Sequence, residues 1–72
     1  MTKTEFMEVL QRTLAGSLGS GTVSGHMRYY QDYFDSQLAM GKDEMQITAE
    51  LGDPRLLAKT IIEAAKREGM GG

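Results

Sequence analysis

The stretch that decides the fold is Ala49-Glu50-Leu51-Gly52-Asp53-Pro54, in which the end of one helix meets the start of the next. Glycine commonly ends a helix because it adopts a left-handed backbone without steric cost. Asp53 is a preferred N-cap residue, and Pro54 suits the first helical position, where its missing N–H is no loss. We therefore expect a short helix that ends at a left-handed Gly52, and a last helix that begins at Pro54.

The residues on both sides of this junction complete the two helices. Asp43 with Gln46 three residues later is typical of a capping box, and it predicts the start of the short helix. The residues of the short helix that we expect to point inward are Met45, Ala49 and Leu51. The expected buried face of the last helix consists of Leu57, Ala58, Ile61, Ala64 and Ala65. Leu56 and Ile62 fall outside that arc.

A first long helix is predicted near the N-terminus. Thr2 and Glu5 have the spacing of a capping box, so the helix should begin beside them. One apolar face then recurs at helical spacing and contains Phe6, Val9, Leu10, Thr13 and Leu14. Gly16 is the expected end of this helix, again in a left-handed conformation.

A second long helix is predicted after a glycine-rich loop over residues 16–21, with its start between Ser20 and Ser24 and its end at Gly41. Its expected buried stripe contains Val23, Met27, Tyr30, Phe34 and Leu38. Beside that stripe lie Tyr29, Tyr33 and Met40. The sequence thus predicts an all-α fold, a small bundle of three main helices plus one short helix before the last. We expect one domain over residues 1–69 and a flexible tail over residues 70–72.

The composition limits the classes of function. A chain of 72 residues has room for one domain, and without cysteine it has neither disulfides nor a cysteine-based zinc site. The net charge of −2 lacks the basic excess typical of nucleic-acid binders, so no direct nucleic-acid contact is expected. The apolar runs are far shorter than the ~20 residues that cross a bilayer, and no signal peptide is indicated. A cytoplasmic location is therefore expected.

No group of residues in the chain has the spacing of a catalytic or metal site. The glycines of residues 19–25 do not follow a strand, and their spacing fits neither a dinucleotide fingerprint nor a P-loop. His26 is the single histidine and has no second ligand at metal-binding spacing. The carboxylates are explained by helix caps and solvated helix faces. We therefore expect no enzymatic activity, no cofactor and no metal.

A helix-turn-helix DNA-binding unit is an alternative interpretation of the junction at Gly52. That motif usually has a small residue four positions before the turn glycine, and Thr48 occupies this position here. Arg55 and Lys59 at the start of the last helix are compatible with DNA contact, but the chain as a whole is acidic. A structural oligomerisation module is a second alternative.

Three sequence elements carry a resemblance to a known family. They are Lys3-Thr4-Glu5-Phe6-Met7 in the first helix, Tyr29-Tyr30-Gln31-Asp32-Tyr33-Phe34 in the second, and Leu51-Gly52-Asp53-Pro54 before the last. With these elements, residues 2–66 resemble the HAAS-type signalling domain, a helical domain of bacteria. The sequence departs from that family at Leu18-Gly19-Ser20-Gly21-Thr22, where an acidic start of the second helix is usual.

The resemblance implies a regulatory role. HAAS-type domains are often encoded beside PadR-like transcription regulators, and they commonly precede transmembrane segments or a sensor region on the cytoplasmic side of the membrane. The resemblance therefore implies a protein–protein interaction module that relays a signal to a PadR-like regulator. Any link to a membrane would run through segments absent from these 72 residues.

Four residues are candidates for contact with a protein partner or with a second copy of the chain. Tyr29, Tyr33, Leu56 and Ile62 are large apolar or aromatic residues that fall off the central stripes of their predicted helices. Tyrosine is enriched among the residues that dominate interface energies. We therefore expect these four residues to mark the partner-binding surface.

Overall fold

The computed structural model describes the backbone of residues 1–70 and the side chains of residues 1–67. Its helices are α1 (Lys3–Ala15), α2 (Ser20–Ala39), α3 (Glu44–Leu51) and α4 (Pro54–Met70), and residues 1–70 contain no strand. The predicted all-α fold with a short helix before the last is confirmed. The domain boundary at residue 69 stays a prediction, since α4 is helical through Met70 and residues 71–72 of the expected tail lie outside the described residues.

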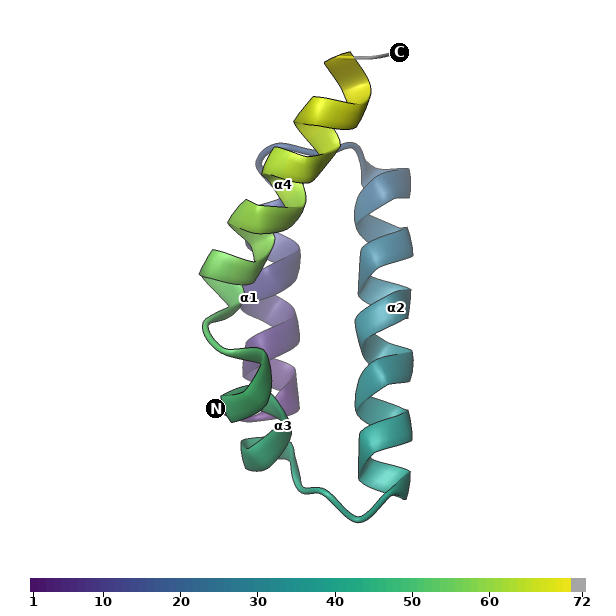
Figure 1. The fold of residues 1–72 in the computed structure, drawn as a ribbon, viewed down its shortest axis with the longest axis vertical. Coiled ribbons are helices and arrows are strands. Elements are labelled where there is room, and N and C mark those ends of the chain that lie inside the picture. Colours follow the sequence, from purple (N-terminus) through teal and green to yellow (C-terminus); the bar gives the residue numbers. More distant parts are fainter. Residues whose placement is uncertain (71–72) are drawn as a thin grey trace.

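Helix α1 is the element on which the other three helices pack (Figure 1). Helices α1 and α2 run antiparallel as a hairpin, and α4 lies along α1 on a different side from α2. The short α3 lies at the end of the bundle where α2 finishes and α1 begins. The molecule is elongated, with dimensions of 41 × 18 × 18 Å. Because the main helices share α1 instead of surrounding a common axis, the core follows α1.

The core contains apolar residues from all four helices. Its buried members are Phe6, Leu10, Leu14, Val23, Phe34, Ile47, Ala58 and Ile62. At its centre the rings of Phe6 and Phe34 meet edge to face, with centroids 5.6 Å apart and an angle of 62°. Such aromatic pairs add to the stabilisation that comes from burial alone. The predicted apolar face of α1 is confirmed, with Val9 and Thr13 half-buried at its margin.

The capping box predicted for α1 is present. Thr2 accepts a hydrogen bond from the backbone N–H of Glu5 (3.2 Å), and the Glu5 carboxylate accepts one from the N–H of Thr2 (3.1 Å). Gly16 does cap the other end of α1, but its φ of −69° is right-handed, so the expected left-handed conformation is wrong. The connection to α2 continues as a tight turn in which the N–H groups of Ser17 and Leu18 bond Leu14.

Helix α2 starts at Ser20, at the beginning of the predicted interval, so residues 20 and 21 of the expected glycine-rich loop are helical. Gly19 precedes it without a side-chain cap. At the other end Gly41 has a φ of 98°, and the N–H groups of Gly41 and Lys42 bond Leu38 and Gln37 respectively. This is the hydrogen-bond pattern of a Schellman motif. The predicted end of α2 at Gly41 is thus confirmed.

The predicted buried stripe of α2 is only partly right. Val23 and Phe34 are buried, whereas Met27 and Tyr30 are half-buried and Leu38 is exposed. Leu38 lies near the end of α2, where the hairpin with α1 has ended and the chain turns toward α3. No core is therefore available to cover it.

The predicted inward face of α3 is wrong for Met45 and Ala49 and right for Leu51, which packs against the core. Met45 and Ala49 are exposed and Leu51 is half-buried, while the buried residues are Ile47 and Thr48. Thr48 can be buried because its hydroxyl has hydrogen-bond acceptors on two sides, the carbonyl oxygens of Met1 (3.0 Å) and Met45 (3.1 Å), which share its one hydrogen. Burial of a polar group costs little when it is hydrogen-bonded. The Asp43 cap is confirmed, since its carboxylate accepts from the N–H of Gln46 at 2.8 Å.

The buried face of α4 is rotated from the predicted one. Pro54, Ala58 and Ile62 are all buried and follow one another at intervals of four residues, so they form one stripe along the helix. The expectation that Ile62 lies outside the buried face is therefore wrong. Ala64, which was expected inside, is exposed. The small Ala58 at the centre of the stripe, with no exposed surface, allows α4 to approach α1 closely.

Candidate interaction surfaces

The four residues predicted to mark a partner surface are not equivalent in the structure. Tyr29 and Leu56 are strongly exposed, at 63% and 64%. Tyr33 is half-buried and packs against the core, and Ile62 is itself a core residue. Tyr29 and Tyr33 belong to α2 and Leu56 to α4, which lie on different sides of α1 (Figure 1). The structure therefore does not gather the four residues into one surface.

The tyrosines of α2 form a small aromatic patch. The rings of Tyr29 and Tyr30 meet edge to face with centroids 4.9 Å apart. Partial burial raises the pKa of the Tyr30 hydroxyl, and the neighbouring Tyr29 adds to this shift. Tyr30 therefore stays neutral at physiological pH. The ring of Tyr30 packs against one side of the Tyr29 ring, and the rest of the Tyr29 ring is exposed to solvent.

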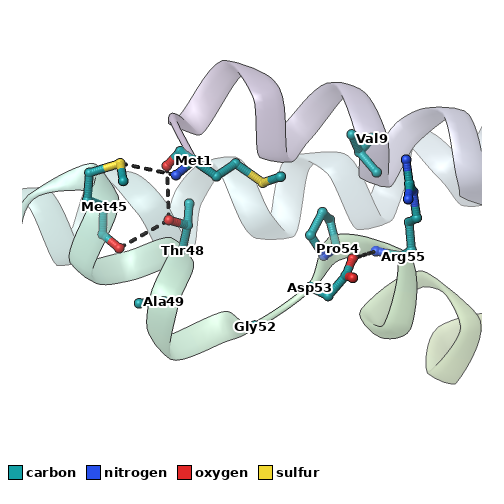
Figure 2. A pocket seen from close by; sticks show the side chains of 9 residues that line it. All are labelled: Met1, Val9, Met45, Thr48, Ala49, Gly52, Asp53, Pro54 and Arg55. Carbon is teal, nitrogen blue, oxygen red and sulfur yellow. Dashed lines mark hydrogen bonds between the residues drawn. The ribbon is translucent and has the colours of Figure 1, made fainter.

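A groove at the α3 end of the molecule has a volume of about 500 Å³. It runs between the start of α1, the exposed side of α3 and the start of α4 (Figure 2). The residues that line it are Met1, Val9, Met45, Thr48, Ala49, Gly52, Asp53, Pro54 and Arg55. Its lining is mainly apolar, with one acidic and one basic residue. The sequence analysis missed this site because residues from three separate segments form it.

Hydrogen bonds hold the first residue of the chain against α3. The carbonyl oxygen of Met1 accepts from the Thr48 hydroxyl, and the nitrogen of Met1 donates to Met45 Sδ at 3.1 Å (Figure 2). Close by, the N–H of Lys3 donates to a carboxylate oxygen of Glu44 at 2.8 Å. The sulfur of Met45 thus lies against the backbone of Met1, whose own side chain extends away from Met45 (Figure 2). The side chains of Met1 and Met45 remain 42% and 58% exposed respectively.

The α3–α4 junction fixes the other end of the groove. Gly52 has a φ of 82° and a ψ of −158°, so its φ is positive as predicted, but its ψ lies outside the left-handed helical region. This backbone region is nearly exclusive to glycine. The Asp53 carboxylate accepts from the N–H of Arg55 at 2.8 Å, which confirms the predicted cap of α4. The side chain of Arg55 then extends toward Val9 of α1 (Figure 2).

Charge is unevenly distributed along the chain. Residues 1–53 contain four basic and eight acidic residues, whereas residues 54–72 contain four basic and two acidic ones. The basic residues of α4 are Arg55, Lys59, Lys66 and Arg67, and all are exposed. Two salt bridges occur among the described side chains, Lys3 with Asp35 (3.5 Å) and Lys42 with Glu50 (2.9 Å). Neither involves α4, so its basic side chains are open to a partner.

Several carboxylates have structural roles, as helix caps or as partners in salt bridges. Glu5, Asp43 and Asp53 cap helices, and Asp35 and Glu50 form salt bridges. The Thr2 backbone N–H, and then its hydroxyl, lower the pKa of Glu5 below its ordinary value. Within the described residues no cluster of histidine and carboxylate side chains has the arrangement of a metal site. None of the described helices combines the length and apolar character that spanning a membrane requires.

Comparison with known proteins identifies the family. Neither the curated proteins nor the solved structures gave a match to this chain. The family model of the HAAS domain matches residues 5–60, a segment that begins in the first turn of α1 and ends within α4. It thus includes the core pair Phe6 and Phe34 and the whole α3–α4 junction. The match covers well over half of the chain, which therefore belongs to the HAAS family.

Proposed function

We propose that this domain is a non-enzymatic protein–protein interaction module of bacterial signalling and transcription regulation, which relays a signal to a PadR-like regulator in the cytoplasm. Membership of the HAAS family supports a regulatory role. The observation that carries the proposal is the exposure of large apolar side chains on a very small domain. Tyr29 and Leu56 are each more than 60% exposed, and other apolar residues at the margin of the core are only half-buried.

Exposed aromatic and aliphatic side chains of this kind suit a contact surface. Such residues dominate interface energies when a partner covers them. Single exposed apolar residues are common on protein surfaces, so their contribution has to be measured. Tyr29 and Leu56 are therefore the candidate contact residues. Tyr33 packs at the margin of the core, and Ile62 is a core residue that stabilises the fold.

The direct test measures binding between the purified domain and a PadR-like regulator of the same organism by isothermal titration calorimetry. We expect micromolar binding that weakens at least fivefold in a Tyr29→Ala, Leu56→Ala double variant. Arg28→Ala is the control, since Arg28 is an exposed residue of α2 next to Tyr29 in sequence. Circular dichroism must show that both variants keep the helicity of the parent. If the regulator does not bind the parent domain, the proposed function is wrong.

One observation favours a second function, DNA binding through the α3–α4 unit. The two helices are joined by Gly52 and Asp53 alone, and α4 carries half of the basic residues of the chain. Phosphate contacts produce a steep dependence of affinity on salt concentration. Fluorescence polarisation with a labelled 20-base-pair duplex at 50 and 200 mM salt separates the two functions. The docking proposal expects no salt-dependent binding in the micromolar range.

A further inference from the structure

The groove between Met1 and Met45 has the form of a site for side chains of another protein. At about 500 Å³ it lies within the size range of small-molecule pockets, which bury most of the ligand surface. Here, however, the two methionine walls are themselves 42% and 58% exposed. A site with walls this open cannot enclose a metabolite. It can receive apolar side chains that project from the surface of a partner.

The composition of the walls supports adaptable apolar contact. Met1 and Met45 have flexible, polarizable side chains, a property that other proteins use at binding surfaces that accept varied partners. Neither residue belongs to the core or packs against it. Ala49 and Pro54 add small apolar surfaces to the lining. An apolar side chain placed against the two methionines would bury surface that the fold leaves in water.

The charge at one end of the groove indicates the chemistry of the occupant. Arg55 is exposed, extends across the groove toward Val9, and forms no salt bridge with the described side chains (Figure 2). Asp53 also lines the groove, but one of its carboxylate oxygens is bound by the backbone N–H of Arg55 as the cap of α4. The Arg55 guanidinium therefore remains able to bind a carboxylate from outside. Pairing of arginine with carboxylate is among the strongest hydrogen-bonded contacts in proteins.

We propose that this groove binds an acidic amphipathic segment of a protein partner, with an apolar side chain against the exposed side chains of Met1 and Met45 and a carboxylate on Arg55. This inference rests on the proposed function, because it names the chemistry of the partner that the domain docks. It places the main contact at the α3 end of the molecule. Tyr29, by contrast, lies on α2, outside the lining of the groove.

Selection of peptides from a random 12-residue phage library on the intact chain tests the proposal with no assumption about the sequence of the partner. We expect the selected peptides to share a large apolar residue and a glutamate or aspartate within one helical turn of it. Fluorescence anisotropy then measures the affinity of one such labelled peptide for variants of the domain. We expect Met45→Glu to abolish binding and Arg55→Ala to weaken it about tenfold, the order expected for loss of a charge-assisted hydrogen bond.

Matched controls are available within the chain. Met40→Glu changes another exposed methionine, and Arg28→Ala an exposed arginine, and neither residue lines the groove. Both controls should bind the peptide with the affinity of the parent. Because all four altered residues are exposed, unchanged circular dichroism spectra are expected. Replacement of the acidic residue of the peptide by glutamine should weaken binding to the parent and leave binding to Arg55→Ala unaltered.

Each other outcome overturns the inference. Selection of no peptide, or of basic peptides, excludes an acidic occupant, and equal binding by Met45→Glu places the contact elsewhere. Sedimentation that shows self-association lost in Met45→Glu makes the occupant a second copy of the chain. DNA binding lost in Arg55→Ala makes it a nucleic acid. If a PadR-like regulator binds but depends on Tyr29 and Leu56 alone, the groove inference fails while the proposed function stands.

Discussion

In the α1–α2 hairpin Phe6 and Phe34 are fully buried, whereas α3 buries Thr48 and leaves Met45 58% exposed. The hairpin follows the simple rule that large apolar side chains lie inside. At the α3 end, the covered side of the helix combines Ile47, which enters the core, with Thr48, whose hydroxyl bonds the first residue of the chain. A domain of this size has one small core, and it extends along α1. The α3 end therefore contributes less to burial and offers more apolar surface to a partner.

The largest expected effect concerns the centre of the hairpin. Phe34→Ala should lower the free energy of unfolding by about 3–5 kcal/mol, because it removes a fully buried ring that packs on Phe6. Urea titration followed by circular dichroism measures this loss. Tyr29→Ala is the matched control, and we expect a change below about 0.5 kcal/mol because that ring is exposed. Equal losses of stability in the two variants would contradict the assignment of Phe34 to the core and of Tyr29 to the surface.

The second prediction extends the comparison to α4. Ile62→Ala should cost about 2–4 kcal/mol, since Ile62 belongs to the buried stripe that packs on α1. Leu56→Ala removes a similar side chain from the exposed side of the same helix and should change stability by less than about 0.5 kcal/mol. The same urea titration serves both variants. A loss for Ile62→Ala as small as that for Leu56→Ala would place Ile62 outside the buried face, as the sequence pattern predicted.

These two regions also show what the sequence allowed us to predict. The phase of α1 was correct because Phe6, Leu10 and Leu14 are large apolar residues at helical spacing over three turns. Helix α3 has eight residues, about two turns, and its apolar residues do not define a single face. Its covered side is the one where Ile47 enters the core and Thr48 bonds Met1, 47 positions away in the chain. No local pattern contains that information.

The same reasoning applies to Ile62 and to the groove. On α4 the apolar residues occupy a broad arc, and the stripe that is buried is the one in which the small Ala58 lets α1 approach. The helix caps at Thr2, Asp43 and Asp53 were predicted correctly because each depends on residues two or three positions away. The groove was not predicted, because its lining comes from the N-terminal segment, α3 and the start of α4.

A pair of glycines sharpens the comparison at the helix ends. Gly52→Ala should cost about 1–3 kcal/mol, because its φ of 82° with ψ of −158° is strained for any residue with a Cβ. No atom lies within 4 Å of a Cβ built at this position, so the cost is one of backbone conformation alone. Thermal unfolding of the two single variants compares Gly52→Ala with Gly16→Ala.

The opposite sign is expected at Gly16. Its φ of −69° suits any residue, and a Cβ there would meet the carbonyl oxygen of Thr13 at an ordinary 3.5 Å. Gly16→Ala should therefore stabilise the domain by about 0.4–1 kcal/mol, because alanine restricts the unfolded chain. A loss of stability in Gly16→Ala equal to that in Gly52→Ala would contradict the distinction between the two helix ends.

The buried polar contact of α3 gives a smaller effect. Thr48→Val keeps the shape of the side chain but removes the hydroxyl that bonds Met1, and we expect a loss of about 1 kcal/mol. Thr60→Val is the control, because the Thr60 hydroxyl is exposed and bonds only Leu56 within its own helix. Urea titration should show little change for Thr60→Val. Equal effects would mean that the contact between α3 and Met1 does not stabilise the domain.

The smallest expected effect is the pH dependence of the α1 capping box. The Thr2 backbone N–H donates to the Glu5 carboxylate, and this bond, followed by the interaction of the carboxylate with the Thr2 side chain, holds the pKa of Glu5 below its ordinary value in the folded state. A carboxyl with a lowered folded-state pKa stabilises the fold above its unfolded pKa, about 4.3 for glutamate, and loses that effect as the pH falls through the folded-state value.

The parent domain should therefore lose stability from pH 6 to pH 3 by more than Glu5→Gln does, as measured by urea titration at the two pH values. Glu8→Gln is the control, because it removes an equal charge from α1 without removing a cap. If the two glutamine variants lose the same amount, the acid sensitivity comes from net charge. If only Glu5→Gln is less sensitive to acid than the parent, the capping box is the cause.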